Sequence, residues 1–128
     1  MKNRACRIVL GRDLNHHGTL FAGQMAKWLV EACLIKAVKL TGKAENLVCV
    51  NINDLTFKHP VSKGQVVEIE TFVKRVGRTS LTIGAFVYTD SCGTAPILET
   101  AITFVILDTK GRPKPHHLSL ENQSQSPH

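Results

Sequence analysis

The segment FAGQMAKWLVEACLIKAVKL, residues 21–40, has the pattern of a long helix that is apolar on most of its sides. Three polar residues recur at three- and four-residue spacing and form one strip along it: Gln24, Lys27 and Glu31. We expect Thr19 to cap the start of this helix. Thr41-Gly42 is expected to end it, because glycine readily takes the left-handed conformation found just beyond helix ends. Such a helix, about five turns long, needs other elements to enclose it.

Four runs with strand character follow the helix: Leu47–Phe57, Gln65–Arg75, Ser80–Thr89 and Ile97–Asp108. In the first of them, Val48, Val50 and Ile52 alternate with more polar residues, so each strand is expected to bury one face. The connections, including the one with Pro60–Gly64, are short and favour antiparallel neighbours. We therefore predict an α+β fold in which an antiparallel meander curls around one long helix.

Composition places the chain among ordinary globular domains, because 43% of its 128 residues are hydrophobic and 20% are charged. We predict one domain over residues 1–115. A Ser-, Gln- and His-rich tail over residues 116–128 is expected to be mobile. The only continuous apolar run near the start, Ile8–Leu10, is shorter than the core of a signal peptide, and charges interrupt residues 21–40. We therefore expect a cytoplasmic protein without a membrane span.

The formal net charge of +6 indicates an anionic partner, such as nucleic acid, a membrane surface or a phosphorylated small molecule. The basic residues are spread along the chain without interleaved aromatic residues, so nucleic-acid binding rests on charge alone. The adjacent pairs His16-His17 and His116-His117 lack the spacing of two ligands on one helical face. No metal site is predicted.

Four separated segments resemble the hotdog-fold acyl-CoA thioesterases (acyl-CoA hydrolases) of the bacterial and brain type: Asp13–Gly23, Thr56–Val61, Arg75–Ser80 and Gly111–Pro115. The resemblance spans most of the chain. It implies a hotdog fold and hydrolysis of a fatty acyl-CoA by water. It implies no cofactor other than the coenzyme A carried by the substrate. It also implies a homodimer, with sites at the interface, that assembles further into a hexamer.

The resemblance implies that Asn15 and the backbone N–H of Gly23 act at the thioester carbonyl. A helix start has unpaired donors and partial positive charge, which suit the oxyanion that forms when water attacks. The simpler alternatives are a loop asparagine at position 15 and a glycine that permits close packing at position 23. The coenzyme A contacts are assigned to residues at a hairpin and a later turn: Arg78, Thr79, Ser80 and Arg112.

The chain departs from the family at Val30, where an aspartate usually serves as base or nucleophile. Glu31 follows, but one residue turns a helix by about 100°, so the two side chains point differently. Glu31 is our candidate carboxylate in a homodimer, with an ion pair to Lys27 as its simpler role. Two alternatives are a hetero-oligomer with an Asp-bearing hotdog chain and a non-catalytic acyl-CoA binding or regulatory protein. Asp13 is a further nearby carboxylate, whose simpler role is to form a turn.

Overall fold

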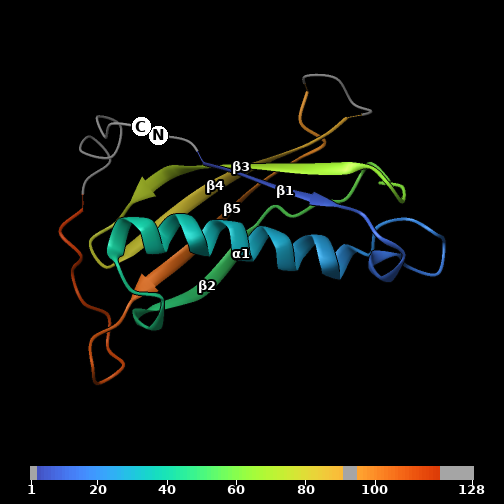
Figure 1. The fold of residues 1–128 in the computed structure, drawn as a ribbon. Helices are drawn as coiled ribbons and strands as arrows, with labels where there is room; N and C mark the ends of the chain where they lie inside the picture. Colours follow the sequence, from blue (N-terminus) through green and yellow to red (C-terminus); the bar gives the residue numbers. More distant parts are fainter. Residues whose placement is uncertain (1–2, 91–94, 119–128) are drawn as a thin grey trace.

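The structure is a computed structural model that describes residues 3–90 and 95–118 (Figure 1). Its main elements are β1 (Asn3–Ile8), α1 (Ala22–Thr41), β2 (Leu47–Asn53), β3 (Val66–Val76), β4 (Ser80–Thr89) and β5 (Leu98–Ile106). Two short 3₁₀ turns, Gly11–Asp13 and Ala44–Asn46, precede α1 and β2 respectively. Among the described residues no helix is long and apolar enough to span a membrane.

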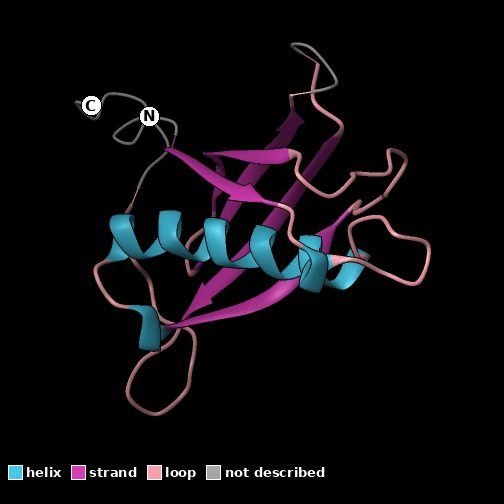
Figure 2. Ribbon diagram, turned by 45° about the vertical axis from the view of Figure 1, so that its right-hand side comes forward, coloured by secondary structure: helices cyan, strands magenta, loops and turns pink. Residues whose placement is uncertain are grey.

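The five strands form one antiparallel sheet in the order β1-β3-β4-β5-β2, and α1 lies across one face of it (Figure 2). The α+β hotdog architecture expected from the sequence is confirmed. Within it, β3, β4 and β5 form the predicted meander. The prediction that β2 and β3 are neighbours is wrong, because β2 pairs with β5, as in Leu47↔Ile106. The strand ends at Asn53 instead of Phe57, which leaves a connection long enough to cross to the far side of the sheet.

The helix begins and ends within one residue of its predicted bounds, but its cap differs from the prediction. Phe21 is the N-cap residue and makes no side-chain hydrogen bond to the helix, so the capping role expected for Thr19 is wrong. Thr19 is instead bonded to Asn15 and bridges to Ser62. The predicted stop is confirmed, since Gly42 has a φ of 97° and donates its N–H to the Val38 carbonyl at 2.7 Å.

The core lies between α1 and the central strands. Trp28, Leu29 and Cys33 are buried on the helix side. The sheet contributes Val67, Ile69, Leu81, Ile83, Ala85, Val87, Ile102 and Phe104. The helix is covered on one side only, because Ile35 on the opposite side is largely exposed. The single chain therefore does not enclose its helix as the sequence pattern suggested.

The edge strand β2 also departs from the prediction that each strand buries one face. Val48, Val50 and Ile52 are all exposed, and the pairing register shifts between Cys49 and Asn51. An edge strand has a neighbour on one side only, so less of its surface is covered within one chain. The result is an apolar edge that the chain does not cover by itself.

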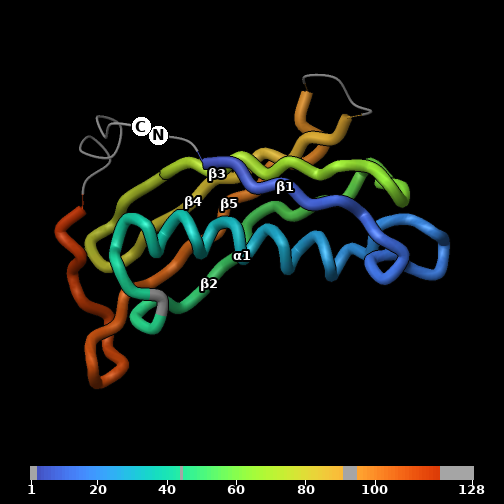
Figure 3. Tube along the Cα trace, in the orientation of Figure 1, coloured from blue at the N-terminus to red at the C-terminus, as the bar shows by residue number. Residues whose placement is uncertain are grey.

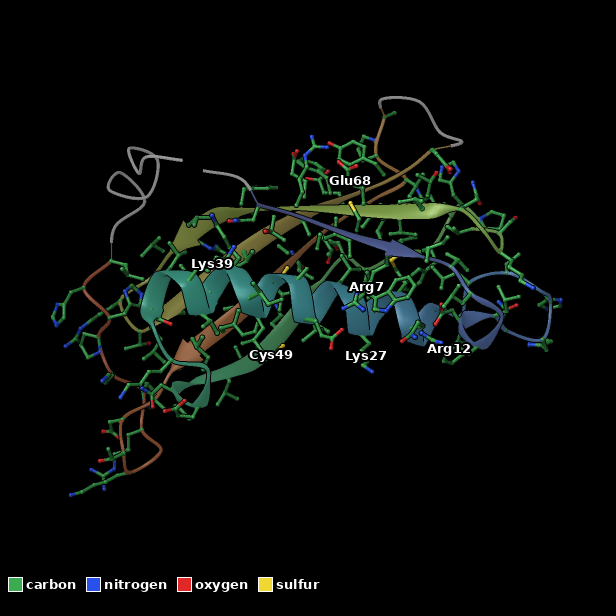
Figure 4. The ribbon with its side chains drawn as sticks, in the orientation of Figure 1. Arg7, Arg12, Lys27, Lys39, Cys49 and Glu68 are labelled. Atoms are coloured by element: carbon green, nitrogen blue, oxygen red, sulfur yellow. The ribbon has the colours of Figure 1, made fainter. Side chains whose placement is uncertain are left out.

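Strand β1 forms the other edge and was not predicted from the sequence. It pairs with β3, and Arg4 makes ion pairs with Glu70 and with Glu68, which lies on the sheet face away from α1 (Figure 4). These contacts join residues far apart in the chain, which no local pattern reveals. At the other end of the chain, His116 is bonded to Ser80, whereas residues 119–128 of the predicted mobile tail lie outside the described residues.

Candidate active site

Asn15 is the centre of the loop that leads into α1. Its side-chain oxygen accepts hydrogen bonds from the backbone N–H of His17 at 2.9 Å and of Thr19 at 3.1 Å. Its amide nitrogen donates to the Thr19 hydroxyl at 3.1 Å. The backbone closes the same turn, because Asn15 N–H donates to the Thr19 carbonyl at 2.7 Å. In the single chain, Asn15 therefore shapes its own loop, and it is half-buried in that loop.

Asp13 fixes that loop to the helix. The side chain is only 4% exposed; one carboxylate oxygen accepts the Leu10 N–H at 2.9 Å and the other accepts the Gln24 amide at 2.8 Å. Its backbone carbonyl accepts the N–H of Phe21 at 2.8 Å. The bond from Gln24, then that from Leu10, lowers the pKa of the Asp13 carboxyl below its ordinary value of 3.8, although burial opposes the shift. Asp13 is thus ionised at neutral pH, and both of its carboxylate oxygens accept hydrogen bonds that hold the loop to the helix.

The first turn of α1 contains N–H groups that have no partner within the helix. The first bonds to the helix start are those of Gln24 N–H and Met25 N–H to the Phe21 carbonyl, at 3.0 and 3.1 Å. The N–H groups of Ala22 and Gly23 precede them and have no partner within the helix. A side chain on Gly23 would collide with the ring of Phe21, whose Cε2 lies 2.5 Å from the position of such a Cβ. A side chain at position 23 would therefore require the exposed Phe21 ring to move.

The side chains of Val30 and Glu31 point in different directions, as the rotation of about 100° per helical residue requires. Val30 packs against the core, whereas Glu31 lies 3.5 Å from the Arg7 guanidinium of β1, with its side chain 45% exposed. The partner expected for Glu31, Lys27, points away from the helix instead (Figure 4). Arg7 also lies over the Trp28 ring, 5.9 Å from its centre. Glu31 is thus a solvent-accessible carboxylate held beside a cation on the β1 side of α1.

Cys33, one turn beyond Val30 along the helix, does not replace the missing acid, because burial raises the pKa of its thiol to about 12. At neutral pH it stays protonated, so it serves neither as a base nor as a thiolate nucleophile. Within the described residues no three potential metal ligands gather at one place.

The residues assigned to coenzyme A lie at the other end of the helix. Figure 3 shows the β3–β4 hairpin beside the end of α1, while the loop before α1 lies at the opposite end. Arg78 and Arg112 are exposed, and the hairpin is held by Thr79 O, which accepts the Ile106 N–H at 3.0 Å. Ser80 is half-buried. Its carbonyl is bonded to the His116 ring at 2.7 Å.

A cavity of about 250 Å³ adjoins this hairpin, between the end of α1 and residues 114–118. Lys43, Lys114 and His116 are among its lining residues, so its walls are rich in groups that attract phosphate. The structure thus gathers Asn15 and Gly23 at one end of the helix and the four predicted coenzyme A residues at the other. A helix of 20 residues separates these two groups by about 30 Å. Glu31 lies between them, eight residues or about 12 Å along the axis from Gly23.

Two residues of this region carry roles that the sequence did not reveal. Gln24 was placed in a polar strip, but its amide binds Asp13. Phe21 was counted with the apolar helix, yet it is the N-cap residue and is 55% exposed. The signal for Phe21 was present in the sequence, because a phenylalanine just before a helix start occupies a position that usually carries a small polar residue.

Comparison with known proteins gives one consistent result. The sequence model of the Thioesterase superfamily matches residues 17–96. Acyl-coenzyme A thioesterase 11 of Mus musculus is 33% identical over 78 residues, which are 61% of this chain and 13% of the mouse protein. An uncharacterized acyl-CoA thioester hydrolase of Bacillus subtilis (strain 168) is 27% identical over 80% of this chain, which spans 60% of that protein.

Comparison with solved structures gives the same result as comparison with sequences. A hexameric acyl-CoA thioesterase in its apo form is 32% identical and superposes with a TM-score of 0.78, covering 89% of this chain and 74% of its own. The acyl-CoA hydrolase of Staphylococcus aureus, solved with butyryl coenzyme A and coenzyme A, is 27% identical with a TM-score of 0.77 over 89% of this chain and 68% of its own. Variants of that hydrolase replace by alanine an asparagine at its position 28 and an aspartate at its position 43. The separation between those two positions equals that between Asn15 and Val30 here.

Proposed function

We propose, because the chain belongs to the Thioesterase superfamily, that it hydrolyses the thioester of a fatty acyl-CoA to the free acid and coenzyme A. The observation that carries this proposal is the likeness of 89% of the chain to solved acyl-CoA hydrolases. The chain spans only part of the curated relatives it matches, so the activity of the whole protein is included in the proposal.

The helix start supplies the electrostatic part of the reaction. Water attacks the thioester carbon, and the carbonyl electrons move to its oxygen, which accepts the N–H of Gly23 at the positive end of α1. The carbon–sulfur bond then breaks and coenzyme A leaves as a thiolate. The Asn15 amide lies beside the helix start and orients the water or the carbonyl. This chemistry needs no cofactor beyond the coenzyme A of the substrate.

Glu31 is the carboxylate that we assign to the proton transfers. It takes a proton from the attacking water and returns it to the departing thiolate. Its exposure leaves it open to solvent and substrate, in contrast to Asp13, whose two oxygens are already occupied by Leu10 and Gln24. Within one chain Glu31 lies too far along the helix to act at Gly23, so the proposal requires a second chain.

A dimer of this chain brings the carbonyl donors and the coenzyme A residues together, and Glu31, at the middle of the helix, reaches the carbonyl through a shifted packing of the two helices. Two chains joined along the exposed β2 edge, with their helices antiparallel, place the helix start of one beside the helix end of the other. The carbonyl then meets Gly23 of one chain while the coenzyme A phosphates meet Arg78 and Arg112 of its partner. We extend the proposal to a hexamer, the assembly of the similar apo thioesterase. A hetero-oligomer with an Asp-bearing hotdog chain is the alternative that Val30 motivates.

We also propose a cytoplasmic location for the chain. The described cysteines, Cys6, Cys33 and Cys49, are free thiols, as is usual in a reducing compartment.

Val30 further motivates a second candidate function, the binding of acyl-CoA without turnover in a regulatory role.

The test follows thiol release from acetyl-, butyryl- and decanoyl-CoA while the mass of the protein in solution is measured. We expect turnover by an oligomer and a loss of about 100-fold or more in Glu31→Gln. Glu99→Gln, which removes an exposed carboxylate of β5, is the matched control and is expected to keep its activity. Full activity in Glu31→Gln would refute the role of Glu31. Binding of coenzyme A without thiol release from any substrate would favour the non-catalytic function.

A further inference from the structure

We infer that Phe21 contacts the acyl chain of the substrate and sets the preference of the site for long over short acyl groups. This inference rests on the proposed function. It concerns the space immediately in front of the helix start, where the donors for the carbonyl oxygen lie.

The first observation is the position of the Phe21 ring. Its Cε2, Cζ and Cδ2 atoms lie 2.5, 3.1 and 3.2 Å from the point where a Cβ of Gly23 would stand. Because the Cα–Cβ bonds of a helix tilt toward its N-terminus, a ring at that point borders the space before the first-turn N–H groups. A carbonyl oxygen bonded to Gly23 therefore brings the attached acyl carbon beside this ring.

The second observation is that the backbone of Phe21 is fixed while its ring is free. Its N–H is bonded to the Asp13 carbonyl at 2.8 Å, and its own carbonyl accepts the N–H of Gln24 and of Met25. The ring is nevertheless 55% exposed, the second largest exposure among the large apolar side chains described. A rigid backbone that presents an exposed aromatic ring suits a contact with an apolar ligand.

The third observation is that phenylalanine at position 21 is an unfavourable N-cap residue for the stability of the helix. The N-cap is usually Ser, Thr, Asp or Asn, whose side chain bonds a free N–H, and Phe21 makes no such bond. A polar cap would compete for the very donors that the carbonyl oxygen needs. A phenylalanine leaves them free and, together with an acyl chain, excludes water from them, which strengthens their effect on an oxyanion.

The test compares Phe21→Ala and Phe21→Leu with the unchanged protein on acetyl-CoA and decanoyl-CoA. We expect Phe21→Ala to lower the ratio of kcat/KM for decanoyl-CoA to that for acetyl-CoA by about tenfold, with Phe21→Leu between them. Ile8→Ala is the control, because Ile8 has a similar exposure of 52% but belongs to β1 and not to the helix start. It should leave the ratio unchanged.

Calorimetric binding makes the inference independent of turnover. Phe21→Ala should weaken binding of the decanoyl-CoA thioether analogue, which cannot be hydrolysed, by roughly the same factor and leave binding of coenzyme A alone unchanged. Absence of thiol release in the unchanged protein would refute the proposed function while this binding result still decides the role of Phe21. An unaltered ratio together with unaltered binding would overturn the inference. Equal losses for both substrates with a changed mass in solution would overturn it too, because Phe21 would then serve the assembly.

Discussion

Replacing Val30 by aspartate tests whether the chain lacks only its usual acid. Val30 is half-buried against the core, so Val30→Asp loses about half of the free energy gained by burying a valine. The new carboxylate is also partly desolvated at this position. Together these terms destabilise the fold by about 1–2 kcal/mol, which lowers the Tm by roughly 4–8 °C. A correctly placed base contributes roughly 10²–10⁴ to the rate, so we expect Val30→Asp to raise kcat by at least tenfold despite this cost.

The assay measures thiol release from butyryl-CoA beside thermal unfolding of the same samples. Val30→Asn is the matched control, because it has nearly the same shape as aspartate and a similar cost in stability, but it cannot accept a proton. The second comparison adds Glu31→Gln to each background. If aspartate at position 30 takes over as the base, removing the Glu31 carboxylate should matter much less in Val30→Asp than in the unchanged chain.

Two results would refute this reasoning. One is a folded Val30→Asp variant that binds coenzyme A yet turns over no faster than Val30→Asn. The other is an equal gain in both variants, which would show that polarity or loosened packing at position 30, and not a base, changes the rate.

Three further predictions follow from the contacts in the structure. Because the pKa of Asp13 is lowered on folding, its contribution to stability is present above pH 3.8 and is lost as the pH falls through its folded value. Asp13→Asn should therefore be less stable than the unchanged chain at pH 7, and the difference should shrink as the pH falls below 3.8 in urea titrations. Burial lowers the pKa of Lys36 from 10.5, while its ammonium donates to the Asn3 side-chain oxygen at 2.8 Å, so the unchanged chain should gain stability relative to Lys36→Met as the pH rises toward 10.5 in the same titrations. Val50→Lys on the exposed edge should leave the chain folded but reduce its mass in solution, as measured by sedimentation, and an unchanged mass would exclude β2 from the interface.

The sequence predicted those parts of the fold whose signals are local. The helix was found because its apolar pattern and its glycine stop lie in one continuous segment, and β4 has its predicted bounds for the same reason. Strand β1 was missed, because its stability comes from pairing with β3 and from Arg4 contacts to Glu68 and Glu70, more than 60 residues away. The position of β2 was also not predictable from short connections, since its partner β5 is the last strand of the chain.

The candidate site shows the same division. The absence of an acid at Val30 was visible in the sequence, and the structure adds the reason why Glu31 is no direct substitute: its side chain turns toward Arg7. The structural role of Asp13 was invisible, because it depends on Leu10 and Gln24 meeting at one carboxylate. Which residue contacts another across a loop is set by packing, and residue type alone does not specify it.

The separation of the site along α1 makes assembly a requirement of the proposed chemistry. The proposed carbonyl donors lie at the helix start, the proposed coenzyme A residues lie about 30 Å away, and the candidate carboxylate lies between them. One chain therefore holds the two parts of the proposed site at opposite ends of its helix. An antiparallel pair of chains joins complementary halves twice, and its interface uses the apolar β2 edge that the single chain leaves exposed. One dimer would thus cover the exposed edge and complete the divided site. A substitution that separates the chains should therefore remove activity even where every site residue is intact.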